Sequence, residues 1–128
     1  MTKNQLSSER SQRQLRVAEQ IKHVLIDALK RNKFHDEELL EANLFSVAEV
    51  RISPDLKNAT AYTTSLKGEE HVKNCLKALN RASGYFQKEI ANQLSLKFTP
   101  RIKFVSDSSV GNVDRIEELL RKIHEEEK

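Results

Sequence analysis

The spacing of hydrophobic residues predicts a long amphipathic helix near the start of the chain, over residues 7–32. Ser7 or Ser8 is the expected N-cap, because a serine side chain accepts hydrogen bonds from first-turn N–H groups. Apolar residues then recur every three or four positions, which is the pattern of a helix that buries one side. The members of this apolar stripe are Leu15, Ala18, Ile21, Val24, Leu25, Ala28 and Leu29.

A β-hairpin is predicted over residues 44–66, where the hydrophobic period falls to two. Residues 53–58 are turn formers, and residues 59–66 are rich in Thr and Tyr, as strands are. The acidic stretch from Asp36 to Glu41 is then a loop or short turn before the hairpin. In the first strand, residues 44–53, the alternation places Ala48, Val50 and Ile52 on one side and Val47, Glu49 and Arg51 on the other.

Two further helices and a third strand are predicted in the second half of the chain. The helical pattern that starts after Gly68 is interrupted at Ala82-Ser83-Gly84, since glycine costs about 1 kcal/mol relative to alanine inside a helix. A third helix runs from about Tyr85 to Ser95, and a strand covers residues 101–105 after Pro100. The expected buried positions are Val72, Cys75, Leu76, Leu79 and Ala82, then Phe86, Ile90 and Leu94, then Ile102 and Phe104.

The order helix, strand, strand, helix, helix, strand predicts an α+β fold, a three-stranded sheet with helices on one face. At 128 residues, with 38% hydrophobic and 32% charged residues, the chain fits one soluble domain. We expect this domain over residues 1–107 and a helical or disordered tail over residues 108–128. The lack of a long apolar run and the single cysteine, Cys75, predict a cytoplasmic monomer without a membrane span.

Charge alternates in blocks along the chain, although the net charge is only +3. Residues 1–33 and 71–106 are basic, with net charges of +5 and +6, whereas residues 34–70 and 107–128 carry −5 and −3. Such blocks can fold so that basic segments meet on one face and bind a polyanion. Ordinary charge scatter on a solvated surface is the alternative. The candidate RNA-binding residues are Arg10, Arg13, Arg16, Lys73, Lys77, Arg81, Ser83, Gly84, Lys88, Arg101 and Lys103.

The order of elements resembles the K-homology fold in its bacterial (type II) arrangement, in which a Gly-x-x-Gly loop grips a nucleic-acid backbone between two helices. Here Ala82-Ser83-Gly84 replaces that loop, and this departure resembles the ribosome-binding factor A family. The similarity extends to Arg13, Arg16 and Val17, to Val50-Arg51-Ile52-Ser53-Pro54-Asp55-Leu56 with Ala59, and to Leu96-Lys97-Phe98-Thr99-Pro100-Arg101-Ile102-Lys103-Phe104-Val105-Ser106-Asp107. Gln87 stands where the family commonly has arginine.

The resemblance implies a protein that binds the immature 30S ribosomal subunit and its 16S rRNA and assists late rRNA processing. It also implies a role in growth in the cold, action without catalysis or cofactor, and a maturation GTPase as a further candidate partner. From the residues, small side chains at Ser83 and Gly84 would let a phosphate approach the backbone, and the next helix would offer N–H groups to it. With no Trp, the chain lacks an aromatic platform, so recognition should depend on RNA shape.

Two other function classes stay open. One is a DNA-binding helix-turn-helix protein with Gly84 in its turn, although Asn80 stands where that motif needs a small apolar residue. The other is a protein-interaction adaptor that docks through the helix predicted over residues 114–128. An enzyme or metal site is poorly supported, because the four histidines are dispersed and His71 with Cys75 supplies only two ligands.

Overall fold

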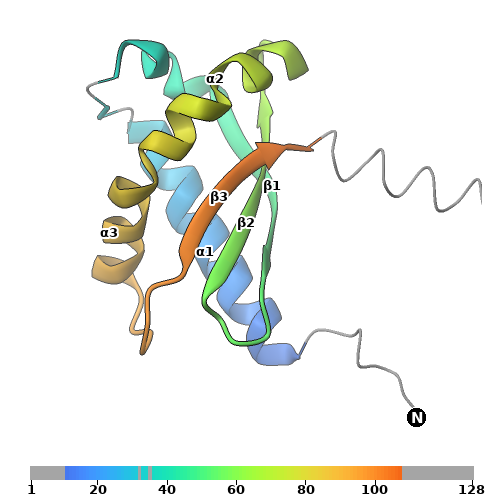
Figure 1. Cartoon of the computed structure of the whole chain (residues 1–128), viewed down its shortest axis with the longest axis vertical. Coiled ribbons are helices and arrows are strands. Elements are labelled where there is room, and N and C mark those ends of the chain that lie inside the picture. Colours follow the sequence, from blue (N-terminus) through green and yellow to red (C-terminus); the bar gives the residue numbers. More distant parts are fainter. Residues whose placement is uncertain (1–10, 32, 35, 108–128) are drawn as a thin grey trace, which may run out of the picture.

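The computed structural model describes residues 11–31, 33–34 and 36–107. The predictions for Ser7, Ser8, Arg10 and the tail lie outside these residues. The elements are α1 (Gln12–Arg31), the short 3₁₀ turns η1 (Glu37–Leu39) and η2 (Ala42–Leu44), β1 (Phe45–Ile52), β2 (Asn58–Ser65), α2 (Glu69–Arg81), α3 (Ser83–Gln93) and β3 (Arg101–Ser106), as Figure 1 shows. The predicted order of helices and strands is confirmed.

Helix α1 begins at Gln12, later than predicted, and Ser11 rather than Ser7 or Ser8 precedes it. The Ser11 hydroxyl accepts a hydrogen bond from the Gln14 N–H at 3.1 Å, and the Ser11 N–H donates to Gln14 Oε1 at 3.0 Å. This is a capping box, which satisfies two backbone donors at the helix start. The same Gln14 side chain donates from Nε2 to the carbonyl of Ile52 at 3.2 Å. Gln14 thereby joins the start of α1 to the end of β1.

The buried side of α1 agrees with the predicted stripe except at its first member. Leu15 is 48% exposed, so its assignment to the core was wrong. Val17 is buried in its place, because the helix turns that position towards the sheet. Arg13, Arg16 and Arg31 lie on the exposed side of α1.

The sheet has the strand order β1-β2-β3. β1 and β2 form the predicted hairpin and run antiparallel, whereas β2 and β3 run parallel. A parallel connection needs a crossover, and here the chain crosses over through α2 and α3. The structure therefore has the α+β architecture predicted for the K-homology-like domain.

A β-bulge in β1 changes which residues point inward. Val47 pairs with Thr63 and Glu49 with Tyr62, so Ala48 is an extra residue in the strand. Because an extra residue reverses the alternation, Val47 is buried and Ala48 is exposed. The prediction had these two residues on the opposite sides, since it assumed an unbroken period of two.

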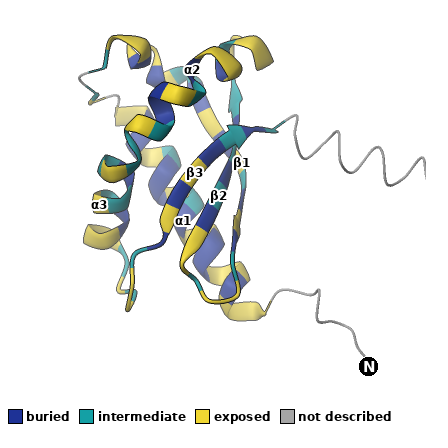
Figure 2. Ribbon diagram, in the orientation of Figure 1, coloured by how far each residue is buried: buried dark blue, intermediate teal, exposed yellow. Residues whose placement is uncertain are grey.

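Only one face of the sheet is buried within the described residues, and the helices cover it (Figures 1 and 2). Each inward row crosses all three strands: Val50 is in register with Ala61, and Ala61 with Phe104. All three are at most 4% exposed. The buried faces of the three helices complete this single hydrophobic core. Leu76, Ala82 and Leu94, which were expected inside, are half-buried and pack against its border.

The junction between the second and third helices differs from the prediction. Helix α2 ends at Arg81 and α3 begins at Ser83, so Ala82 alone separates them. Gly84 lies in the first turn of α3 and does not form the break. Helix-turn-helix motifs join their helices by a turn of about three or four residues, so this junction does not favour the DNA-binding alternative.

No helix in the described part of the chain is long and apolar enough to cross a membrane.

Candidate nucleic-acid interface

Ala82 is the residue at which the chain changes direction between α2 and α3. Its backbone angles are φ −85° and ψ 6°, and its N–H reaches the carbonyls of Ala78 and Leu79, both at 3.1 Å. Its own carbonyl accepts the N–H of Tyr85 at 3.0 Å. One residue therefore closes α2 and opens α3. The exposed Gly84 follows in the first turn of α3, and a Cβ added there would meet no atom within 4 Å.

Aromatic rings support this junction from inside. Tyr85 is half-buried and packs edge-on against Phe34, with ring centroids 5.1 Å apart, and against Phe86 at 5.6 Å. A hollow of about 330 Å³ lies beside the junction, and its lining includes Lys33, Phe34, Arg81, Ala82 and Tyr85. The packing of Tyr85 favours a structural role over base stacking.

Two of the candidate cations on α2 are already paired with carboxylates. Lys73 Nζ lies 2.8 Å from Glu69 on the same helix. Arg81 contacts Asp36 at 3.0 Å and Glu38 at 2.7 Å, both from the acidic segment around η1. The N–H of Glu38, together with the Arg81 guanidinium, lowers the pKa of the Asp36 carboxyl. The acidic block of the sequence thus neutralises part of the basic block that follows it.

Lys77 and Lys88 differ from Lys73 and Arg81 in their ion pairing. Both are exposed, and neither forms an ion pair within the described residues. Lys77 lies on α2 between the two paired cations, and Lys88 lies on α3. These two ammonium groups are available to phosphate without first breaking an ion pair.

Arg101 and Lys103 lie on the opposite face of the sheet from the core. They alternate with the buried Ile102 and Phe104 along β3, as predicted, and Lys103 is in register with Thr60. This face carries no helix of the described chain. The candidate residues therefore divide between the helical side and the open face of the sheet, contrary to the expectation of a single basic face.

The side chain of Gln87 forms a hydrogen bond within the domain. Its Nε2 donates to the carbonyl of Pro100 at 3.0 Å, which ties α3 to the start of β3. The Gln87 side chain is therefore used inside the domain.

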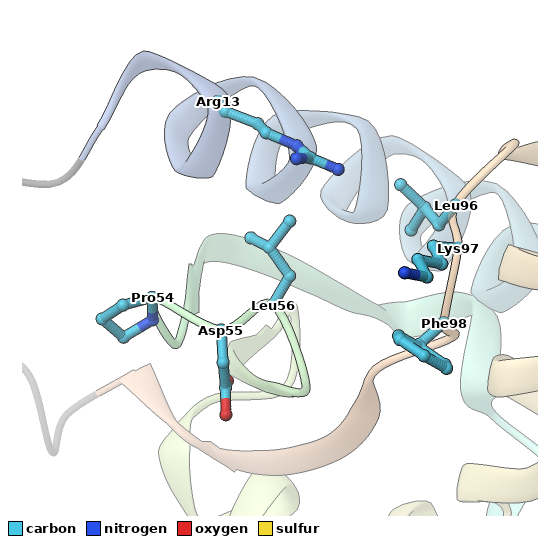
Figure 3. Close-up of a pocket in the computed structure, with 7 residues that line it drawn as sticks. All are labelled: Arg13, Pro54, Asp55, Leu56, Leu96, Lys97 and Phe98. Atoms are coloured by element: carbon cyan, nitrogen blue, oxygen red, sulfur yellow. The ribbon is translucent and has the colours of Figure 1, made fainter.

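A second hollow, of about 230 Å³, lies between the start of α1, the hairpin turn and the loop before β3 (Figure 3). Among the described lining residues, Arg13 is the one that was a candidate. Phe98, which is 59% exposed, and Lys97 come from the loop, and Leu56 comes from the turn. This group was not predicted from the sequence. A signal was present, because Phe98 fits no helical or strand period and follows a lysine.

His71 and Cys75 serve packing. The His71 ring stacks on Phe45 with centroids 4.5 Å apart, and its Nδ1 lies 2.6 Å from the Ser65 hydroxyl. Cys75 is buried, as predicted, and burial raises the pKa of its thiol. Among the described residues no group of three or more His, Cys, Asp or Glu is placed to hold a metal.

Comparison with known proteins gives consistent matches. A model of the family described as ribosome-binding factor A matches residues 13–120. Ribosome-binding factor A of Novosphingobium aromaticivorans is 45% identical over 121 residues, which are 94% of this chain and 88% of that protein.

Two structural comparisons show the same fold. The crystal structure of ribosome-binding factor A from Thermus thermophilus aligns with a TM-score of 0.60 and 24% identity, over 74% of this chain and 97% of that one. A homology model of the Thermus thermophilus factor, fitted into a cryo-EM map of a complex of the 30S subunit with ribosome-binding factor A, aligns with a TM-score of 0.55 and 23% identity, over 72% of this chain and 92% of that one.

Proposed function

Because the chain belongs to the ribosome-binding factor A family, we propose that it binds the immature 30S ribosomal subunit and its 16S rRNA. In this role it assists late rRNA processing and subunit maturation by binding alone, without a cofactor. The observation that carries the proposal is the family match over residues 13–120, which spans almost every described helix and strand. The homology model that was fitted into a cryo-EM map of a complex of the 30S subunit with ribosome-binding factor A supports the choice of partner.

The distribution of cations supplies the physical mechanism. Lysine and arginine side chains that neutralise phosphates release counterions, which gives an affinity that falls with salt. Lys77 and Lys88 contribute most directly, since among the described residues no carboxylate pairs with either of them. Such contacts position a protein on RNA more than they read its sequence. A maturation GTPase is a further proposed partner.

Sedimentation of a cell extract through a gradient tests the proposal. We expect the protein to travel with free small subunits and not with translating ribosomes. A free peak of low mass at low salt would contradict the proposal.

We also propose that residues 1–107 suffice for RNA binding and that residues 108–128 are a separable tail. A chain that ends at residue 107 should then bind small subunits with nearly the affinity of the full chain. A large loss would favour the adaptor alternative, in which the tail carries the interaction.

A further inference from the structure

We propose that the hollow beside Phe98 binds one unpaired nucleobase of an RNA strand. The inference rests on the proposed function and specifies what this part of the surface recognises. The base would stack on the Phe98 ring, and the neighbouring phosphates would meet Arg13, Lys57 and Lys97.

Phe98 differs from the other four phenylalanines of the chain. Phe45, Phe86 and Phe104 are buried in the core, and Phe34 packs against Tyr85, whereas Phe98 is 59% exposed. An exposed ring in a hollow is not stabilised by burial in the core. It offers a flat apolar face to a ligand, which is how single-strand binders hold bases.

Two lysine ammonium groups lie over this ring in cation–π contacts, Lys57 Nζ at 6.0 Å and Lys97 Nζ at 5.6 Å from the centroid of Phe98. A base that stacks on the ring would take the place of an ammonium group, which would then turn to a flanking phosphate. Arg13 lines the same hollow from α1, and in Figure 3 the Lys97 ammonium points into the space below its guanidinium. A base on the ring would therefore have positive charge on several sides, as the phosphates of an RNA strand require.

The one carboxylate among the described lining residues, Asp55, is turned away. Asp55 accepts hydrogen bonds from the Ser53 hydroxyl at 2.6 Å and from the Lys57 N–H at 3.0 Å, and both lower the pKa of its carboxyl. In Figure 3 its side chain points away from Arg13. Its negative charge is thus used within the hairpin turn and does not oppose an RNA strand in the hollow.

The walls are held in place before any ligand arrives. The Arg101 N–H donates to the Lys57 carbonyl at 2.8 Å, which fixes the start of β3, just after the Phe98 loop, against the hairpin turn. Leu56 has a φ of 62°, in the left-handed region that bulky residues rarely adopt, and it is half-buried against the core. This conformation directs the Leu56 side chain towards Arg13, where it forms the apolar floor of the hollow (Figure 3).

The size of the hollow selects the ligand. Its volume of about 230 Å³ is below the range of about 300–1,000 Å³ of sites that enclose drug-sized molecules, so it fits one ring system. In an RNA duplex the base faces are stacked on one another and are not accessible. The ligand is therefore an unpaired nucleotide in a loop, bulge or single-stranded segment.

The test uses the full chain and a single-stranded RNA of about ten nucleotides, within the site sizes of single-strand binders. The RNA carries 2-aminopurine, whose fluorescence is quenched when the base stacks. We expect quenching with the wild-type chain and with Phe98→Tyr, which keeps the ring. Phe98→Leu, which keeps an apolar side chain but no aromatic face, should bind roughly 5- to 100-fold more weakly.

Two controls separate stacking from folding and from charge. Leu66→Ala removes another exposed apolar side chain, which is 86% exposed just after β2, at the end of the hairpin opposite its turn, and it should leave quenching unchanged. A duplex of the same length should bind Phe98→Leu and the wild-type chain equally. Equal quenching by Phe98→Leu and the wild type would overturn the proposal. The proposal would also be overturned if Phe98→Leu lost as much affinity for the duplex as for the single strand.

Binding of the same proteins to purified small subunits keeps this inference distinct from the proposed function. A wild-type chain that binds subunits but does not quench the oligonucleotide would overturn the base-binding hollow alone. A wild-type chain that fails to bind subunits would overturn the proposed function.

Discussion

Asn80 connects α2 to the outer edge of β3 through a single side chain. Its Oδ1 accepts the N–H of Phe104 at 2.8 Å, and its Nδ2 donates to the Phe104 carbonyl at 3.1 Å. The amide thus replaces the neighbouring strand that β3 lacks on this side. Asn80→Leu should lower the free energy of unfolding by about 2 kcal/mol, because it leaves two backbone groups unpaired near the core. Urea denaturation followed by circular dichroism measures the change.

Asn74 provides the matched control for this substitution, since it lies on the same helix and is exposed. Asn74→Leu should change stability by less than about 0.5 kcal/mol, as surface substitutions usually do. Equal effects at the two positions would mean that the hydrogen bonds to Phe104 contribute little.

A substitution at Gly84 can distinguish a structural role of this glycine from a role in binding. Because its φ is not positive and a Cβ would meet no atom within 4 Å, the fold itself does not need glycine there. Gly84→Ala should leave the domain equally stable or more stable by up to about 1 kcal/mol. If a phosphate approaches this backbone, the same variant should bind small subunits more weakly. Thermal unfolding and subunit binding, measured on one preparation, decide; unchanged binding would remove Gly84 from the interface.

At the scale of elements, the acidic segment around η1 holds Arg81 at the end of α2. Asp36→Asn keeps an oxygen that can accept the Glu38 N–H, and combined with Glu38→Gln it removes both charges beside Arg81. We expect this double variant to bind 16S rRNA more tightly, by roughly tenfold or less at about 0.1 M salt, because one more cation is free for phosphate. Filter binding at several salt concentrations measures it.

Glu37→Gln combined with Glu70→Gln is the control for that loss of two charges, because both residues are exposed and neither forms an ion pair within the described residues. An equal gain in affinity with this second double variant would mean that net charge acts, and that Arg81 has no particular place in the interface.

The same segment predicts a dependence of stability on pH. The pKa of the Asp36 carboxyl is lowered in the folded chain from its usual 3.8, first by the Glu38 N–H and then by Arg81. A lowered pKa stabilises the fold above the unfolded value, and this contribution is lost as the pH falls through the folded value. The Asp36→Asn chain should therefore lose less stability than the wild type below about pH 4. Acid unfolding of both chains measures this. A difference in stability between them that stays the same at every pH would contradict the prediction.

For the whole molecule, the division of cations between two faces decides which of them act together. Lys77 and Lys88 lie on the helical side, whereas Lys103 lies on the open face of the sheet. Each lysine that contacts a phosphate should, when changed to alanine, reduce the slope of log affinity against log salt by about one. We expect this reduction for Lys77→Ala and Lys88→Ala. Lys30→Ala, on the exposed side of α1, is the control and should leave the slope unchanged.

Much of the fold could be predicted because hydrophobic spacing follows local geometry. The period of α1 indicated its buried side correctly from Ala18 onward, and Ile102 and Phe104 alternate with Arg101 and Lys103 as predicted. The bulge at Ala48 could not be predicted, because it depends on how β1 pairs with β2. The error at Leu15 also depends on packing between elements, since its side chain lies beside Ala48, Glu49 and Val50 of β1 but stays 48% exposed at the border of that contact.

The sequence by itself determined the order of elements, the hydrophobic core and the membership of a family, because these depend on residue type and spacing. Only the tertiary structure decided that Arg81 is paired. Arg81 looks like Lys77 in the sequence, but Asp36 and Glu38 from the segment around η1 pair with it, whereas the pair of Lys73 with Glu69 is local to α2. The same holds for the hollow at Phe98, which is built from a helix start, a turn and a loop that are distant along the chain. Contacts between distant segments require the packed backbone, and spacing along the chain does not contain them.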